Sequence, residues 1–404
     1  MCDFAAHLVD NVMPHVPVRQ WVLTVPHDLR FRLAFDPKLT GVVLRTFVSV
    51  VSAWLRKKAR SIGIRGTLKT GGVTVIQRFG SALNLNVHYH CALIDGVYRI
   101  PLDGPPMFHP VPAPSDQEVA AIVAAVCRRI TRKLARNGAL EGDPVLEREP
   151  LLAALANASV AGRVATGARR GAKVLRVGSP REPLEATIVS KRCAFVEGYN
   201  LHANVRIGAN DRQGLEHLAR YLSRPPIAVD RLKQLDDGRL ALKLKRAFND
   251  GTESIIFTPG ELIEKLVVIV PRPRRHSTIF HGVLAPAAAI RGEIVPRPVV
   301  PPGPQQSESE RNPKPEKPGR KRWADLLKRV FLVDALDCPK CHGRMRVLAM
   351  IIKADAVVQI LRNFGLPTEP PPISPSRAPP QGELFARGGD SAWAEPPAAD
   401  DWPA

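Results

Sequence analysis

The chain has 404 residues, which is long enough for one large domain or two modest domains with an ample core. It carries 58 Lys and Arg residues against 38 Asp and Glu residues, a formal net charge of +20, which favours nucleic acid over a membrane surface as partner. No apolar run of about 18 residues and no basic-then-apolar leader is present, so we expect a cytoplasmic protein without a membrane span or signal peptide.

The N-terminal part of the chain predicts a strand, a helix and two further strands. Residues 20–25 predict a buried strand, and the apolar periodicity of residues 40–59 predicts a helix. The side chains that face inward on this helix are those of Val43, Phe47, Val50, Val51 and Trp54. Residues 73–79 and 87–94 predict two strands, and their short connector makes them antiparallel neighbours. These two strands would form the floor of a site.

The middle of the chain predicts an inserted segment followed by a strand. Residues 103–180 are interpreted as the insertion, in which Ser115 and Glu118 form a capping box for a helix to about Asn137. A strand is predicted from residue 194 to residue 205.

A helix, a hairpin and a second helix follow. The first helix begins at residue 210 or 211, and Pro225 and Pro226 must end it. Residues 240–245 and 254–258 predict a hairpin around an Asn-Asp-Gly turn, and Thr258 opens the next helix.

Composition divides the chain into four parts. We expect a main domain over residues 1–298, a basic Pro-rich linker over 299–322, a small helical module over 323–365 and a disordered Pro-rich acidic tail over 366–404. The main domain is expected to be α+β, with a mostly antiparallel central sheet and flanking helices.

Two histidines, His88 and His90, stand two residues apart in a predicted strand. Because strand side chains alternate between faces, both imidazoles point the same way, about 6–7 Å apart. Such a pair can share one divalent metal ion and leave coordination positions open for a substrate oxygen. Two core or surface histidines on an ordinary amphipathic strand would show the same pattern, so other residues must decide.

Tyr221 lies near the end of the helix before the proline pair, between Arg220 and Arg224. A phenol is a poor nucleophile unless a cation lies close, and guanidinium groups with a bound metal would also stabilise phosphate charge. Tyrosine, metal and arginine together suit attack on a phosphodiester. The alternative is a plain amphipathic helix with Tyr221 as part of its apolar stripe.

The chain resembles the rolling-circle transposases with HUH chemistry of the insertion-sequence ninety-one group, over roughly residues 5–377. Ordered blocks carry the resemblance: QRFGSALNLNVHYH at 77–90 with Asp-Gly-Val at 95–97, LARYLSRPP at 218–226, and PRPR at 271–274 with HGVLAP at 281–286. It implies an HUH-endonuclease-like fold, an enzyme that cleaves and joins single-stranded DNA, and element ends as the DNA partner. His88 and His90 would bind Mg²⁺ or Mn²⁺, Gln77 would be a third ligand, and Tyr221 would form a 5′-phosphotyrosine.

Two features depart from the family's usual pattern. Members with two tyrosines place the first one four residues before the second, where this chain has His217, so the chain resembles the single-tyrosine branch. Relatives also begin with a zinc-binding domain rich in cysteine and histidine, and we expect this chain to lack it. Recognition of the element's ends would then be reduced.

The remaining candidate residues are basic side chains and a cysteine pair. Arg220, Arg224, Arg272, Arg274 and Arg275 are expected to contact phosphates rather than read bases. Cys338, Cys341 and His342 resemble half of a zinc knuckle, but a structural Zn²⁺ site needs four ligands, and a reduced pair in a small core is the alternative. Two further functions stay open: a catalytically silent single-stranded-DNA-binding remnant and a metal-dependent hydrolase.

Overall fold

The computed structural model describes residues 1–136, 149–178, 190–244, 247–248, 251–271, 275–296, 321–347 and 351–368. The chain forms two compact units, one that includes residues 3–303 and a second that includes residues 304–390. Most of the expected linker at 299–322 and of the expected tail at 366–404 lies outside the described residues.

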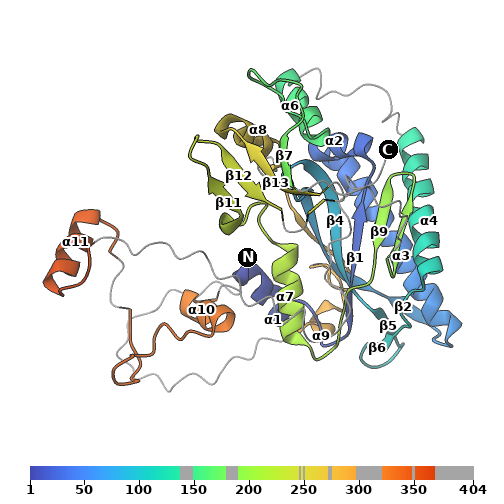
Figure 1. Ribbon diagram of the computed structural model, residues 1–404. Helices are drawn as coiled ribbons and strands as arrows, with labels where there is room; N and C mark the ends of the chain where they lie inside the picture. The colour runs from blue at the N-terminus through green and yellow to red at the C-terminus, as the bar shows by residue number, and fades with distance from the viewer. Residues whose placement is uncertain are drawn as a thin grey trace. The chain divides into compact units, whose positions relative to one another are not determined.

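A seven-stranded antiparallel sheet forms the centre of the first unit (Figure 1). Its strands in spatial order are β14 (Thr278–Gly282), β3 (Gly71–Phe79), β4 (Leu85–Ile94), β1 (Val18–Thr24), β9 (Tyr199–His202) and β8 (Cys193–Val196), and β10 (Arg206–Ile207) also pairs with β1. The central strand β4 is buried along its whole length, because it has neighbours on both edges and helices on both faces.

Helices cover both faces of this sheet. On one face, α2 (His27–Phe35), α3 (Pro37–Ser61) and α4 (Asp116–Arg136) form a core with side chains such as Tyr89 and Leu93 of β4. On the other face, α1 (Cys2–Asn11) and α7 (Arg212–Leu222) pack against Val73, Val75 and Ala92. Figure 1 shows α3 and α4 on the opposite side from α1 and α7. The alternation of side chains along each strand supplies both faces.

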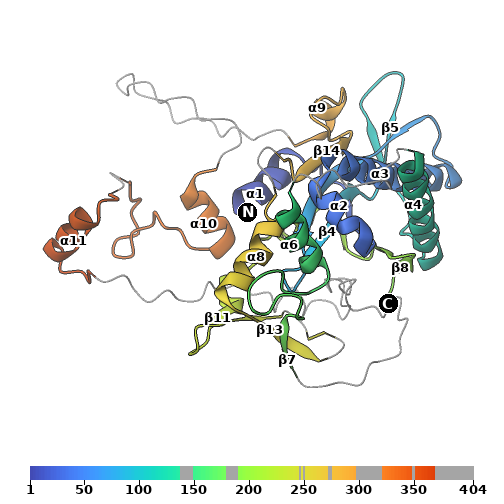
Figure 2. The same cartoon turned by 90° about the horizontal axis from the view of Figure 1, so that it is seen from above.

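The described residues of the first unit also form two smaller sheets and further helices, several of which are labelled in Figure 2. The four-stranded sheet has the order β11 (Leu232–Gln234), β12 (Leu240–Lys243), β13 (Thr252–Phe257) and β7 (Leu175–Gly178), and a short 3₁₀ helix at Val229–Arg231 precedes it. The three-stranded sheet has the order β2 (Thr67–Lys69), β5 (Gly96–Ile100) and β6 (Met107–Pro110). The helices are α6 (Pro150–Val160), α8 (Pro259–Ile269) and α9 (Arg291–Ile294).

The second unit contains two described helices, α10 (Trp323–Phe331) and α11 (Ala354–Asn363). A turn between them holds the cysteine pair, and a bridge between Asp337 and Arg344 closes this turn. No residue of either helix except Ala324 is buried, so these helices contribute little apolar core of their own.

Local sequence patterns correctly predicted several elements around the site. The mixed α and β composition with an antiparallel sheet is as expected, and β1, β3, β4, α3 and α7 lie within a few residues of their predicted positions. The capping boxes of α4 and α8 both form, through Ser115 with Glu118 and Thr258 with Glu261. The predicted hairpin is present as β12 and β13, although its turn at 249–250 lies outside the described residues.

The single strand expected over residues 194–205 is wrong. Two strands, β8 and β9, occupy this segment and pair with each other as a hairpin. Glu197 and Gly198 make the turn with positive φ values of 47° and 78°. Glycine adopts this backbone region without strain, which allows the chain to reverse inside the apolar run.

The expectation that no segment is apolar enough to cross a membrane also fails for α3. This helix has 25 residues and a mean hydropathy of 1.4 over its most apolar window, so by length and composition it could span a membrane. Core helices pass the same test, and Val43, Phe47 and Leu55 of α3 are completely buried in the core. The apolar character of α3 is therefore accounted for by packing within the first unit.

Candidate active site

The two histidines lie side by side on the face of β4 that α7 covers. His88 pairs with Gln77 of β3 and Thr24 of β1, and His90 occupies the next such row, between Val75 and Val22. Their ring centroids are 4.8 Å apart, and the rings are inclined by 69°. Both side chains are buried, with exposed fractions of 8% and 1%.

Hydrogen bonds orient both imidazole rings. Nδ1 of His88 lies 2.9 Å from the carbonyl oxygen of Asn86 and donates to it, so Nε2 of that ring carries the lone pair. Nδ1 of His90 lies 3.0 Å from the side-chain amide of Gln20, and either atom can donate, depending on the amide orientation and the tautomer. Nε2 of His90 is buried and has no hydrogen-bond partner among the described residues.

The surroundings of His90 keep its ring neutral. Burial holds the pKa of His90 well below its usual range, and the neighbouring His88, Arg224 and His202 lower it further. A neutral imidazole is the form that binds a metal ion. His90 therefore has the protonation state that a metal ligand requires.

Gln77 links the sheet to the end of α7. Its amide nitrogen donates to the carbonyl oxygen of Leu222 at 2.7 Å and lies 3.5 Å from that of Tyr221. Its amide oxygen, Oε1, is buried and has no hydrogen-bond partner among the described residues. One side chain thus holds the helix end and leaves an oxygen acceptor beside the histidine pair.

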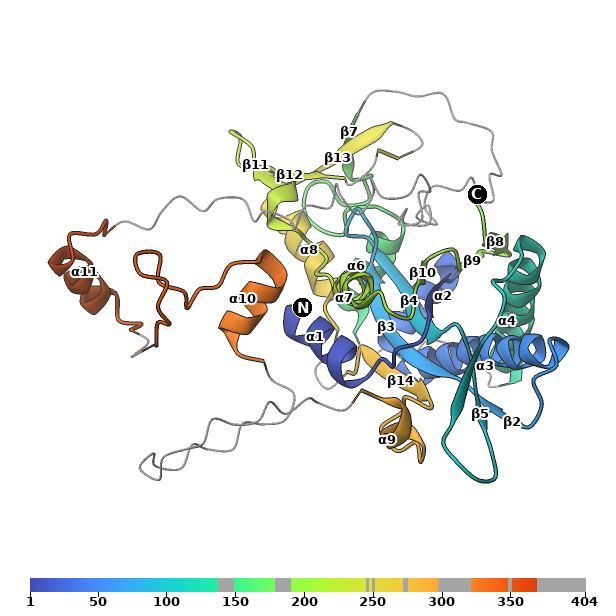
Figure 3. The ribbon, with the colours of Figure 1, turned by 90° about the horizontal axis from the view of Figure 1, so that it is seen from below.

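The helix α7 lies over the sheet near β3 and β4 (Figure 3). Its residue Tyr221 contacts the histidine face of the sheet. The carboxylate of Asp211 caps the helix by accepting from the backbone N–H of Gly214, and an apolar stripe that includes Leu218 and Leu222 is buried against the sheet. The half-buried ring of Tyr221 lies edge-on to His90, with centroids 5.5 Å apart at 90°. The packing of the stripe therefore fixes the phenol next to the histidines.

The candidate arginines differ in where the structure places them. The guanidinium of Arg224 lies over the Tyr221 ring at 4.7 Å from its centroid and over Phe79 at 5.9 Å. Arg220 is half-buried, and one of its terminal nitrogens has no hydrogen-bond partner among the described residues. Arg275 is exposed, whereas Arg272 and Arg274 lie outside the described residues.

The sequence reasoning missed His202 and Gln20. His202 of β9 pairs with Val22, which itself pairs with His90, so both histidines share one row on the same sheet face. Burial lowers the pKa of His202 to about 4, and its Nδ1 has no hydrogen-bond partner among the described residues. Neither residue stands in a recognisable motif, and only the strand register reveals that they belong to the site.

His217, four residues before Tyr221, is half-buried on α7. Burial lowers its pKa, with a smaller contribution from Arg220. Its Nδ1 has no hydrogen-bond partner within the described parts of the chain.

The cysteine pair forms a tight turn in the second unit. The backbone N–H groups of Lys340 and Cys341 face the Cys338 thiol and lower its pKa. His342 adopts a positive φ of 54°, and its Nδ1 lies 3.3 Å from a carboxylate oxygen of Asp337. Across the described residues, no group of three or more His, Cys, Asp or Glu side chains is gathered to hold a metal ion. The turn offers two thiols where a structural Zn²⁺ needs four ligands.

Comparison with known families identifies the chain. The family described as "Putative transposase" matches residues 71–291, more than half of the sequence. The chain belongs to this transposase family. The matched segment of the transposase contains β3, β4 and α7, and with them Gln77, His88, His90 and Tyr221. No curated protein and no solved structure matches the chain.

Proposed function

We propose that the transposase cleaves and rejoins single-stranded DNA through Tyr221, in rolling-circle transposition with HUH chemistry of the insertion-sequence ninety-one type. The observation that carries the proposal is the contact between the Tyr221 ring and His90, at 5.5 Å between centroids. Tyr221 and His90 are 131 positions apart in the sequence, yet the fold brings their rings into contact, which supports Tyr221 as the nucleophile and the histidine pair as metal ligands. With His217 in the other tyrosine position, Tyr221 acts alone.

The residues beside Tyr221 fit a divalent metal ion such as Mg²⁺ or Mn²⁺. The Oε1 atom of Gln77 is a buried acceptor, and Nε2 of His90 is an acceptor in the tautomer whose Nδ1 donates to the oxygen of a reoriented Gln20 amide. Neither atom has a protein partner in the described residues. With His88 they would supply two imidazoles and one amide oxygen, a donor set that suits such ions. The metal, when bound, polarises a non-bridging phosphate oxygen and offsets charge that develops on the phosphate.

The reaction is a transesterification. The Tyr221 oxygen loses its proton to solvent and attacks the phosphorus, forming a new P–O bond, while the bond to the 3′ oxygen breaks. The departing 3′ oxygen takes a proton from water, and the 5′ phosphate stays on Tyr221. Arg224, which lies over the tyrosine ring, is placed to stabilise the phosphate charge as the bonds exchange. A DNA 3′-hydroxyl later reverses the step and joins the strands.

The charge of the protein supplies affinity for the DNA strand. A formal net charge of +20 gives binding that weakens with salt, because each phosphate contact releases a counterion whatever the base. The proposed substrate is the single-stranded end of a mobile element, and the proposed site of action is the cytoplasm. Zn²⁺ at the Cys338 turn is not needed for this chemistry.

The test is to trap a covalent adduct between the protein and a labelled single strand in the presence of Mn²⁺. Tyr221→Phe removes the nucleophilic oxygen at almost no packing cost, so the adduct should disappear. Tyr98→Phe is the matched control, because it makes the same change at a tyrosine buried in the packing beneath α1 and α7. An adduct that persists in Tyr221→Phe would refute the assignment.

Two further outcomes separate the alternatives. If the wild-type protein binds single strands but never forms an adduct, the chain is a silent DNA-binding transposase. A double substitution, His88→Ala with His90→Ala, should abolish the metal dependence and cleavage while DNA binding largely persists. Loss of binding together with loss of folding would mean that the histidines serve the core.

A further inference from the structure

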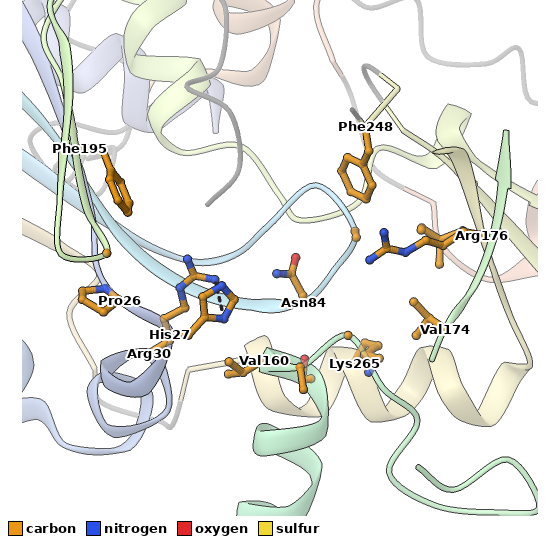
Figure 4. Close-up of a pocket in the computed structure, with 16 residues that line it drawn as sticks. Pro26, His27, Arg30, Asn84, Val160, Val174, Arg176, Phe195, Phe248 and Lys265 are labelled. Atoms are coloured by element: carbon orange, nitrogen blue, oxygen red, sulfur yellow. Dashed lines mark hydrogen bonds between the residues drawn. The ribbon is translucent and has the colours of Figure 1, made fainter. Parts of the chain in front are cut away.

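A cavity of about 450 Å³ opens at one end of the central sheet. Figure 4 shows Asn84, from the loop between β3 and β4, in the middle of this cavity, with Arg30 of α2 on one side and Arg176 of β7 on the other. Its walls come from segments that are far apart in the sequence, including Phe195 of β8 and Lys265 of α8. The cavity is large enough for a nucleotide-sized ligand.

The strand register joins this cavity to the histidine site. One cross-strand row runs from Gln77 to His88, Thr24, Asn200 and Phe195, each paired with the next. Paired residues in antiparallel strands project to the same face, so Phe195 stands on the face that carries His88. Three strand spacings separate these two residues, or about 14 Å. The cavity therefore lies within reach of a strand bound at the histidines.

The lining of the cavity is basic. Arg30, Arg176 and Lys265 contribute cationic groups, and none of the described side chains that line the cavity is acidic. Arg30 and Lys265 are buried, with exposed fractions of 0% and 2%. Burial lowers the pKa of Lys265 to about 8, so an anion beside it would favour the charged form. Buried cations around a solvent-connected space are suited to bind a phosphate group.

Aromatic rings stand at opposite walls of the same space. The guanidinium of Arg176 lies over the Phe248 ring at 5.4 Å from its centroid. Phe195 is 39% exposed, which is unusual for a phenylalanine and leaves a ring surface open. Stacking on aromatic rings and on arginine is how proteins hold unpaired bases.

We propose that this cavity binds one unpaired nucleotide of the DNA strand that flanks the scissile phosphate. The base stacks on Phe195, and the phosphate lies between Arg30, Arg176 and Lys265. This inference rests on the proposed function, because it assumes that a single strand passes across the sheet face at His88. The cavity thereby sets the position of the strand relative to Tyr221.

The experiment measures the affinity of the full chain, carrying Tyr221→Phe to prevent cleavage, for a labelled single strand. A series of oligonucleotides places one abasic site at each position in turn. One abasic position should weaken binding about five- to 150-fold, the range that corresponds to loss of one stacked base. Phe195→Ala should weaken the intact strand by a similar factor and should be insensitive to that same abasic position.

Control variants change the same residue types elsewhere. Arg128→Ala on the exposed side of α4 is the control for Arg176→Ala, and Phe331→Ala in the second unit is the control for Phe195→Ala. We expect Arg176→Ala to weaken binding well beyond the loss seen with Arg128→Ala. Equal losses in the paired variants, or an abasic scan without a sensitive position, would overturn the cavity proposal.

Two arms separate this inference from the proposed function and from a free ligand. Strand binding with a flat abasic scan refutes the cavity alone, whereas absence of any single-strand binding refutes the proposed function. A free deoxynucleoside monophosphate is titrated in parallel. If it binds as tightly as the oligonucleotide, and Phe195→Ala abolishes that binding, the cavity is a small-molecule site and the proposal is wrong.

Discussion

Replacement of Gln77 tests its amide nitrogen and its amide oxygen separately. The nitrogen donates to the Leu222 carbonyl at 2.7 Å, and the oxygen is buried beside the histidines. Gln77→Leu removes both atoms, and Gln77→Glu removes the donor but keeps an oxygen. A buried carbonyl left without its donor costs about 1–3 kcal/mol. Gln77→Leu should therefore lose about this much free energy of unfolding, and Gln77→Glu should lose more, because it also buries a carboxylate in the absence of metal.

The same two variants should differ in their affinity for Mn²⁺. If Oε1 of Gln77 is a ligand, Gln77→Leu weakens Mn²⁺ binding, whereas Gln77→Glu retains it or strengthens it. Urea denaturation measures the stability, and calorimetric titration with Mn²⁺ measures the affinity. Gln234→Leu, at an exposed position of β11, is the control and should change neither quantity. Equal metal affinity in Gln77→Leu and the wild type would refute the ligand role. Gln77 would then serve only to hold the end of α7 through its hydrogen bond to Leu222.

Three further predictions concern stability. Asp95→Ala should lower the free energy of unfolding, measured by urea denaturation, by about 3–5 kcal/mol. The reason is that the buried Arg19 guanidinium loses the carboxylate that accepts its hydrogen bonds at 2.9 Å. A loss below about 1 kcal/mol would contradict this prediction. Gly72→Ala should lower the melting temperature, because a Cβ there would lie 2.3 Å from the Ala92 carbonyl oxygen, whereas Gly208→Ala, with open space around it, should not. Burial lowers the pKa of His281 from 6.5 to about 4, so the unfolded chain takes up its proton first, and the free energy of unfolding should fall as the pH drops from 6.5 to 4. His281→Gln should show a shallower fall over that pH range, and an unchanged slope would count against the assignment.

Periodicity and capping residues were enough to predict the strands and helices that carry the site. The alternation in β4 put His88 and His90 on one face, and the Asp211 cap with the proline pair marked the limits of α7. The β8–β9 hairpin could not be predicted in this way, because its turn interrupts a run whose apolar pattern continues on both sides. Helix α6 was not predicted either, because its apolar residues do not form a clear stripe along one face.

Local sequence patterns could not predict which residues contact the site residues. Gln77 was predicted as a metal ligand from its neighbouring strand, but its contact with the Leu222 carbonyl depends on where α7 packs. His202 and Gln20 join His90 only through the register of β1 with β4 and β9. Phe195 reaches the same face through two further pairings.

The sequence by itself was enough to predict the chemistry that we propose for this transposase and the local elements that carry the proposed residues. Three features can be read without knowledge of the fold: the spacing of two histidines in a strand, a tyrosine shortly before the end of a helix, and the excess of basic side chains. The first two are properties of short segments, and the third is a property of the overall composition. Only the tertiary structure decided which groups meet, that Tyr221 lies against His90 and that basic side chains from distant segments line one cavity at the end of the sheet. Those facts depend on strand register and helix packing, where contacts between distant residues fix the positions and no single segment contains the information.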